Sequence, residues 1–161
     1  MATHYNGTTE ERGALDAYIK LMRSTVAINS RLFPPLLADF GITPTQLGVM
    51  EALHHLGPMA HCALAAKLLV SASNLTTVID NLERDGLVRR DRDPGDRRVS
   101  ITSLTPAGEA RLAEFFPQHV QRLVQAMSGL DADEQAELAR LCRKLGRTAA
   151  AAGQQAHAAA V

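Results

Sequence analysis

The sequence predicts a mainly α-helical fold that contains one small β-hairpin. Apolar residues recur every three to four positions through most of the chain, as they do in helices with one buried face. Between residues 87 and 102 the period changes to two, and a Pro-Gly turn separates two short apolar runs. The 161 residues suffice for one domain with an extension, and 46% hydrophobic residues are too many for a disordered chain.

Long helices are predicted at both ends of the chain. After a polar lead, residues 1–11, that we expect to be disordered, a helix spans 14–32 and is interrupted at Pro34-Pro35 before the apolar residues 36–40. Near the other end, a helix runs from Pro106 to about Met127, and Pro117 is expected to kink it. A capping box at 131–134 opens the last helix, and the Ala-rich residues 149–161 are expected to form a flexible tail.

Three shorter helices are predicted in the middle of the chain. Thr43 and Pro44 begin the first, which ends at Gly57-Pro58. A second helix covers about 62–69, and Ala60 at its cap position cannot accept a hydrogen bond from the backbone. Ser71 caps the third helix, over 72–85, whose buried stripe lies opposite a face of small polar side chains.

The predicted hairpin, with strands at 87–90 and 99–102, has an arginine-rich tip. Six arginines and four aspartates lie between positions 84 and 98, so this segment has a net charge of +2 and the rest of the chain −2. The whole chain is formally neutral, which excludes a globally basic coat for nucleic acid but not a local basic patch. Arginine is the preferred donor to phosphates and base edges, but internal Arg–Asp pairs in a solvated loop would give the same composition.

Three helices followed by a two-stranded hairpin make a winged helix-turn-helix. In this arrangement the third helix enters the major groove of DNA, and the hairpin, or wing, meets the neighbouring minor groove. Ser73, Asn74 and Thr77 have the reach and hydrogen-bonding capacity that a groove-facing helix needs, although the same residues would suit a merely solvated face.

Several motifs in this order resemble the MarR family of multiple antibiotic resistance regulators. They are Thr43-Pro44-Thr45-Gln46-Leu47, Ser73-Asn74-Leu75-Thr76, Leu82-Glu83-Arg84-Asp85-Gly86-Leu87-Val88, Asp93-Pro94-Gly95-Asp96-Arg97-Arg98 and Leu104-Thr105-Pro106-Ala107-Gly108. The resemblance covers about residues 14–147. It implies a homodimer that binds a pseudo-palindromic operator in double-stranded DNA, most often as a repressor released by a small, often phenolic, ligand. It further implies a DNA-binding domain at 42–105 and a dimerisation region made of 12–40 and 106–148.

The resemblance also implies which residues contact DNA. Arg98 is expected in the minor groove, oriented by Asp96, with phosphate contacts from Arg92 and Arg97. Family members often carry arginine at the position of Thr77, so direct reading of guanine is not expected there. The expected DNA-binding residues are Ser71, Ala72, Ser73, Asn74, Thr77, Asn81, Arg92, Asp96, Arg97 and Arg98.

A ligand pocket is expected between the dimer helices and the winged domain. Its candidate residues are Tyr18, Met22, Arg23, Phe33, His54 and His55. A metal site at His54, His55 and His61 is not expected, because adjacent histidines on a helix point about 100° apart. No metal or cofactor is therefore predicted, and stoichiometric metal in the purified protein would be needed to support an enzyme with an unrecognised centre.

Two alternatives stay open beside the ligand-responsive repressor. Cys62 lies near a helix N-terminus, which would favour a redox-responsive regulator, whereas Cys142 occupies an apolar helical position predicted to be inert core. A winged-helix module that binds proteins would instead need an apolar or acidic outer face on its third helix. No catalytic motif is present, so no enzyme is predicted. Without a run of 18 apolar residues or a signal-peptide core, we expect a cytoplasmic protein with no membrane partner.

Overall fold

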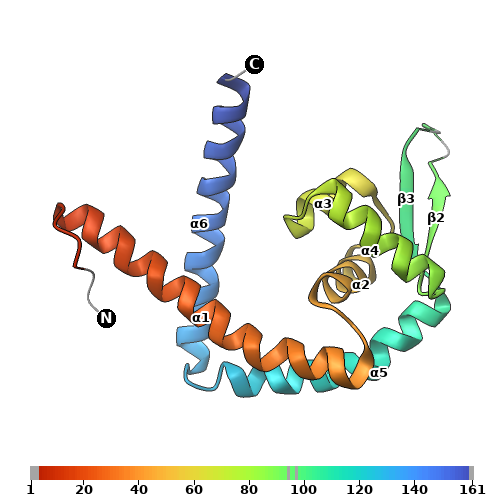
Figure 1. Ribbon diagram of the computed structural model, residues 1–161, viewed down its shortest axis with the longest axis horizontal. Helices are drawn as coiled ribbons and strands as arrows, with labels where there is room; N and C mark the ends of the chain where they lie inside the picture. The colour runs from red at the N-terminus through yellow and green to blue at the C-terminus, as the bar shows by residue number, and fades with distance from the viewer. Residues whose placement is uncertain (1–3, 94, 97, 160–161) are drawn as a thin grey trace. The chain divides into compact units, whose positions relative to one another are not determined.

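The computed structural model describes residues 4–93, 95–96 and 98–159, which form six helices and three short strands (Figure 1). The chain divides into two compact units, of which the first extends to Leu123 and the second begins at Val124. The first unit contains the sheet, the first four helices and most of the fifth, and the second contains the sixth helix. The mainly helical fold with a small hairpin is therefore confirmed.

Helix α1 (Thr9–Phe40) extends further at both ends than the sequence predicted. It begins at Thr9 because Thr8 caps it: the Thr8 hydroxyl accepts a 3.2 Å hydrogen bond from the Glu11 amide. The Glu11 carboxylate in turn accepts a 2.7 Å hydrogen bond from the Thr8 amide, which completes a capping box. The expected disordered lead is therefore wrong for residues 9–11, which are helical.

The predicted interruption at Pro34-Pro35 is also wrong, because α1 continues through both prolines. A proline inside a helix removes a backbone hydrogen bond and costs about 3 kcal/mol. Burial on the same helix offsets this cost, since Leu32 and Leu36 are 4% and 0% exposed. Arg111 of helix α5 (Pro106–Ala126) also donates a 2.6 Å hydrogen bond to the carbonyl oxygen of Phe40, at the end of α1 where carbonyls lack helical partners. Tertiary contacts thus outweigh the local preference.

Three short helices follow, and their ends agree with the prediction to within one residue. The Thr43 hydroxyl accepts a 3.3 Å hydrogen bond from the Gln46 amide, and the Ser71 hydroxyl accepts one of 3.2 Å from the Asn74 amide. Ala60, as expected, provides no side-chain cap. The helices are α2 (Pro44–Leu56), α3 (His61–Leu68) and α4 (Ala72–Arg84).

The strands form an antiparallel sheet with the order β1-β3-β2. Its strands are β1 (Met59–Ala60), β2 (Val88–Arg92) and β3 (Ser100–Leu104). The two long strands lie one to two residues later than predicted, and Val88 pairs with Leu104 while Arg92 pairs with Ser100. Strand β1 was not predicted, because two residues are too few to show a period.

The core of the first unit is built from the inward faces of its helices and of the sheet. Fully buried side chains come from α1, α2, α3, α4, β2 and α5 (Pro106–Ala126): Leu36, Met50, Leu64, Leu75, Ile79, Leu82, Val88 and Phe115. Since α4 contributes one whole stripe to this core, its opposite face is left for solvent. The core thereby fixes which side of α4 can meet a partner.

The second unit consists mainly of helix α6 (Ala132–Ala159), which opens with the predicted capping box between Asp131 and Glu134. The helix continues past residue 148, where the sequence predicted the start of a flexible tail. Cys142 was predicted to be core but is exposed. The cause is that its apolar neighbours Leu138, Leu141 and Leu145 are themselves exposed in the single chain.

Within the described residues, no single helix combines the length and the apolar composition needed to cross a membrane. Helices α3 and α4 reach that length and composition only together, as a pair bent by 109°. Leu64, Leu75 and Ile79 of this pair are buried in the core of the first unit.

Candidate nucleic-acid interface

The N-terminal half of α4 presents small polar side chains to solvent. Its hydrophobic residues Leu75, Ile79 and Leu82 are fully buried on the opposite face. Of the residues that the sequence singled out here, Asn81 is half-buried, and the others are exposed: Ser71, Ala72, Ser73, Asn74 and Thr77. The structure therefore places these five at the surface, as a groove-facing helix requires, and their contact with DNA stays a prediction.

Hydrogen bonds within α4 leave Asn74 as its most available recognition group. The Thr77 hydroxyl donates to the Ser73 carbonyl oxygen at 3.3 Å, and the Ser71 and Ser73 hydroxyl oxygens lie 3.2 Å apart. Within the described part of the chain, the side-chain amide of Asn74 makes no hydrogen bond. It can therefore offer a donor and an acceptor together, which is the pattern that matches adenine in the major groove.

The tip of the wing (residues 88–104) is shaped by two aspartates. The Asp93 carboxylate accepts hydrogen bonds from the amides of Gly95 at 2.7 Å and Asp96 at 3.0 Å. The Asp96 carboxylate accepts a 3.0 Å hydrogen bond from the backbone amide of Arg98. Carboxylates that bond the backbone two residues ahead stabilise tight turns. Asp96 thus contacts the backbone of Arg98, and in this way it fixes the point from which that side chain leaves the tip.

Arg92 and Arg98 come together on the wing. Both line an open hollow of about 460 Å³, Arg92 from β2 and Arg98 from the turn before β3. Both side chains are exposed, and no ion pair involves either of them among the residues that the structure describes. Arg97, also expected at DNA, lies outside the described residues. The two placed arginines therefore remain available for an external anion.

Arg89 and Arg90, by contrast, are engaged within the protein. The Arg89 guanidinium donates to the Ser103 hydroxyl at 3.1 Å and pairs with Asp91 at 3.1 Å. The Arg90 guanidinium donates to Glu83 at 2.9 Å and to Asp80 at 2.6 Å. Internal pairing, the alternative left open for the arginine-rich segment, thus holds for these two.

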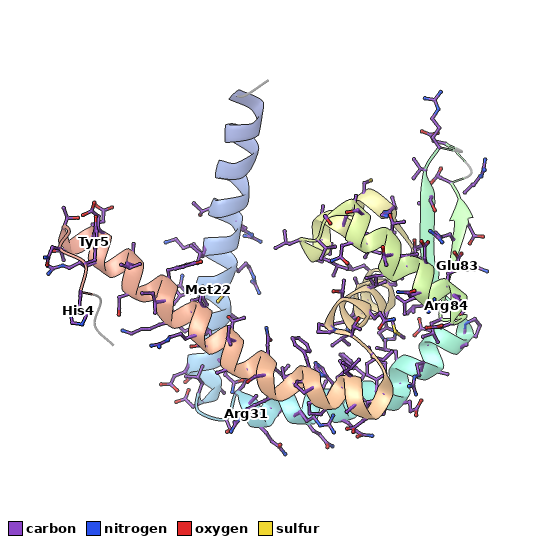
Figure 2. All side chains as sticks on the ribbon, viewed as in Figure 1. His4, Tyr5, Met22, Arg31, Glu83 and Arg84 are labelled. Atoms are coloured by element: carbon purple, nitrogen blue, oxygen red, sulfur yellow. The ribbon has the colours of Figure 1, made fainter. Side chains whose placement is uncertain are left out.

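The ion pairs of Arg90 connect the wing to α4. Figure 2 shows Glu83 near the end of α4, beside the strands of the wing. The hydrogen bond from Arg90 lowers the pKa of the Glu83 carboxyl, and the same bond raises the pKa of Arg90. This pair keeps both groups charged.

The residues proposed for a ligand pocket do not line one cavity within the described part of the chain. On α1, Tyr18 and Met22 are exposed, and Met22 and Arg23 line a shallow depression. Phe33 instead packs against the core. His54 pairs with Glu109 of α5 at 2.7 Å, and His55 lines a separate depression between α2 and α3.

His119 is a functional candidate that the sequence reasoning missed. It is 8% exposed, its ring stacks on Phe116 at 6.4 Å, and the Phe116 ring in turn lies 6.5 Å from His55. Among the residues that the structure describes, its buried Nδ1 atom has no hydrogen-bond partner, and burial lowers the pKa of the ring. A signal was present in the sequence, because His119 follows Leu112 and Phe115 at helical spacing on the buried stripe of α5.

His61 and Cys62, which the sequence analysis considered for metal and thiol chemistry, are the first two residues of α3. The His61 ring contacts the Thr76 hydroxyl at 3.1 Å, and the described residues contain no group of three His, Cys, Asp or Glu placed to hold a metal ion. Cys62 is exposed at the second position of α3, with no second cysteine in the described part of that helix.

Comparison with known sequences places the winged region in a family. The MarR family profile matches residues 42–100. YkoM of Bacillus subtilis, named as an uncharacterized HTH-type transcriptional regulator, is 39% identical over 108 residues, which are 67% of this chain and 70% of the relative. MhqR, another HTH-type transcriptional regulator of B. subtilis, is 29% identical over 84% of this chain and 93% of its own.

Solved structures support the same assignment. A MarR family regulator from Streptomyces coelicolor, determined in complex with DNA, has a TM-score of 0.77 at 25% identity and covers 89% of this chain and 93% of that one. BpsR of Bordetella bronchiseptica, described with its regulation by 6-hydroxynicotinic acid, has a TM-score of 0.70 at 27% identity over 81% and 98% of the two chains. With its winged-helix fold and these relatives, the chain belongs to the MarR family of DNA-binding transcriptional regulators, a family without enzymatic activity.

Proposed function

We propose that residues 42–105 bind double-stranded DNA, with α4 in the major groove and the wing on the neighbouring minor groove. The observation that carries this proposal is the pair of exposed arginines, Arg92 and Arg98, which share one hollow on the wing. A narrow minor groove attracts arginine through its negative potential. The proposed contacts are Ser71, Ala72, Ser73, Asn74, Thr77, Asn81, Arg92, Arg97 and Arg98, with Asp96 shaping the turn before Arg98.

We further propose that the regulator is a homodimer that binds a pseudo-palindromic operator. Apolar side chains repeat along single faces of α1 and α6 and are exposed in the single chain: Tyr18, Met22, Val26, Leu138, Leu141 and Leu145. Contiguous apolar faces of this kind mark interaction surfaces. A second copy of the chain would cover them, which assigns 12–40 and 106–148 to dimerisation. Light scattering coupled to size exclusion should give twice the chain mass, and a monomer at micromolar concentration would contradict the assignment.

We propose repression, relieved by a small aromatic ligand, as the mode of regulation. MdtR of B. subtilis and NicR of Pseudomonas putida, each 29% identical to this chain, are named transcriptional repressors. The DNA binding of BpsR is regulated by 6-hydroxynicotinic acid according to its structural description. A ligand releases the operator only if it binds the DNA-free conformation more tightly than the DNA-bound one.

The seam between α2 and α5 is where we place ligand contact. The Phe116 ring stacks on His119 and meets the His55 ring edge-on, and the buried Nδ1 of His119 has no hydrogen-bond partner among the described residues. An aromatic ligand with a hydroxyl group could stack on these rings and satisfy that nitrogen. Among the pocket residues expected from the sequence, His54 and His55 lie closest to this proposed ligand site. The other four would contact the ligand only if dimerisation brought them to it: Tyr18, Met22, Arg23 and Phe33.

The DNA-binding proposal is tested by fluorescence anisotropy with DNA from upstream of the protein's own gene. We expect tight binding that weakens steeply with salt and is lost in Arg98→Ala. Arg89→Ala is the matched control, because it removes the same charge from a side chain that is already paired. Binding no tighter than to random DNA would call for selection from genomic fragments. An empty selection would contradict the proposal and favour the protein-interaction module.

The ligand proposal is tested on the same complex. Hydroxylated aromatic acids, 6-hydroxynicotinic acid among them, are titrated into protein bound to its operator. We expect release by at least one of them, and a weaker response in His119→Phe, which keeps the stacking but removes the nitrogen. Release that is equally sensitive in both proteins would place the ligand elsewhere.

A further inference from the structure

Hydrogen bonds from Arg90 to Asp80 and Glu83 join strand β2 to helix α4. Its backbone amide donates to the Glu83 carboxylate at 3.1 Å, its Nε atom donates to the same carboxylate at 2.9 Å, and its terminal nitrogen reaches Asp80 at 2.6 Å. Backbone and side chain of one residue are therefore bound to the same helix. A guanidinium that grips two carboxylates has a fixed geometry, because its donors are planar and diverge at set angles.

Arg90 lies at the base of the wing, so these contacts attach the base of the wing to α4. Arg90 pairs across the sheet with Thr102, which also pairs with Met59 of β1. Beyond the next pair, Asp91 with Ile101, only two strands remain, and they carry the tip. Up to the pair of Asp91 with Ile101, the wing is therefore held by three strands and by α4. Closer to the tip, only the pairing of β2 with β3 holds it.

We propose that Arg90 is a positioning residue for DNA recognition: it holds the wing at a fixed angle to α4, so that Arg98 and α4 reach the DNA together. This inference rests on the DNA-binding function proposed above. A two-stranded ribbon twists easily. Because the tip lies several residues from the base of the wing, a small rotation of the base displaces the tip and Arg98 with it. Arg90 acts through the placement of Arg98 and need not touch the DNA itself, since its guanidinium is already bound to two carboxylates.

A purely electrostatic role is the competing explanation. Without Arg90, the carboxylates of Asp80 and Glu83 would be uncompensated near the phosphates of the DNA, and repulsion alone would weaken binding. The two roles differ in what removing the carboxylates should do. If Arg90 only shields them, Asp80→Asn and Glu83→Gln will restore affinity to an Arg90→Gln variant. If Arg90 positions the wing, the triple variant with Asp80→Asn, Glu83→Gln and Arg90→Gln will still bind the operator weakly.

The test combines variants of Arg90 and Arg98 in a double-mutant cycle of operator affinity. We expect Arg98→Ala to weaken specific binding at least about tenfold, in the range of a lost groove contact. Arg90→Gln should weaken it comparably, and the double variant should be within about threefold of Arg98→Ala alone, because a wing out of place has already lost that contact. Arg89→Gln is the control: any effect it has should multiply with that of Arg98→Ala.

A measurement without DNA keeps the anchoring separate from the proposed function. Amide order parameters of Asp91 and Ser100 should fall from about 0.85 toward 0.6 in Arg90→Gln and stay unchanged in Arg89→Gln. Multiplicative effects of the Arg90 and Arg98 variants, or full recovery in the neutral triple variant, would overturn the positioning role. Unchanged order parameters would overturn the anchoring itself, even if the wild type proved not to bind DNA specifically.

Discussion

A Cβ atom at position 108 would overlap the carbonyl oxygen of Leu87. That oxygen cannot retreat easily, because it accepts a 3.0 Å hydrogen bond from the Thr105 amide. The Thr105 hydroxyl adds a 2.6 Å hydrogen bond to the Gly86 carbonyl oxygen and accepts one of 3.0 Å from the Gly108 amide. Gly108 therefore lets the start of α5 lie directly against the segment that joins α4 to the wing.

Gly108→Ala should destabilise the protein by about 3 kcal/mol, at the upper end of the range for overpacked sites. Urea denaturation followed by circular dichroism measures this loss. Gly13→Ala on α1 is the matched control, because no atom of the described residues outside the helix's own backbone lies within 4 Å of a Cβ atom there. The free energy of unfolding of that variant should rise by about 0.5–1 kcal/mol, the usual gain when alanine replaces a solvent-exposed glycine inside a helix. Equal effects at the two positions would show that the overlap at Leu87 relaxes without cost.

Leu69 should be replaceable by glycine with a gain in stability. It ends α3 in the left-handed conformation, at φ 55°, and its side chain is 91% exposed. A side chain in this conformation costs about 1–2 kcal/mol, whereas the extra freedom of glycine in the unfolded chain costs about 0.5–1 kcal/mol. Leu69→Gly should therefore gain about 0.5–1 kcal/mol, since almost no burial is lost.

Thermal denaturation of this variant beside Ala66→Gly checks the argument. Ala66 is exposed on the same helix, and glycine there should lose about 1 kcal/mol. A loss at both positions would mean that the Leu69 side chain contributes a contact that outweighs its backbone strain.

His119 should make folding stability fall as the pH falls. Burial is the main cause of its lowered pKa, the charge of Arg122 lowers it further, and Glu51 opposes the change. Because the unfolded chain binds a proton near pH 6.5 and the native ring binds it only at lower pH, acid favours unfolding. The effect is absent well above pH 6.5 and grows from there down to the native pKa.

Melting temperatures between pH 7.5 and pH 5.5 measure this dependence. His119→Phe should flatten the curve in this window while keeping the stack on Phe116. The other histidines are present in both proteins, so their contributions cancel in the difference. Parallel curves for the two proteins would show that protonation of His119 does not oppose folding.

Sequence reasoning succeeded where local chemistry decides the structure. Caps at Thr43 and Ser71 and the missing cap at Ala60 all follow from a few neighbouring residues, and the structure confirms them. It failed where distant contacts override local preference, as at Pro34-Pro35, where burial and Arg111 keep α1 continuous. A two-residue strand such as β1 has no period of its own and depends on pairing with β3.

The candidate interface divides along the same line. The sequence predicted Arg98 and the exposed face of α4, because each depends on one short segment. Arg98 belongs to a family motif, and the exposed face of α4 follows from the helical period. Which arginines are paired could not be read from the sequence, since Arg90 contacts residues 7 and 10 positions away, on another element. His119 was overlooked because only apolar residues were assigned to the buried face of that helix, although its spacing from Leu112 and Phe115 was visible.

Arg92 and Asn74 should separate the two kinds of DNA contact. Arg92→Ala should weaken binding to operator and to random DNA alike. It should also reduce the slope of log affinity against log salt by about 0.9 per protomer, as the loss of one phosphate contact does. Asn74→Ala should instead weaken operator binding by about 5- to 150-fold and leave random DNA and the salt slope unchanged, because a base contact releases no counterion. If Asn74→Ala weakened both DNAs equally, α4 would contact only the backbone, and sequence selectivity would have to come from the wing and the shape of the minor groove.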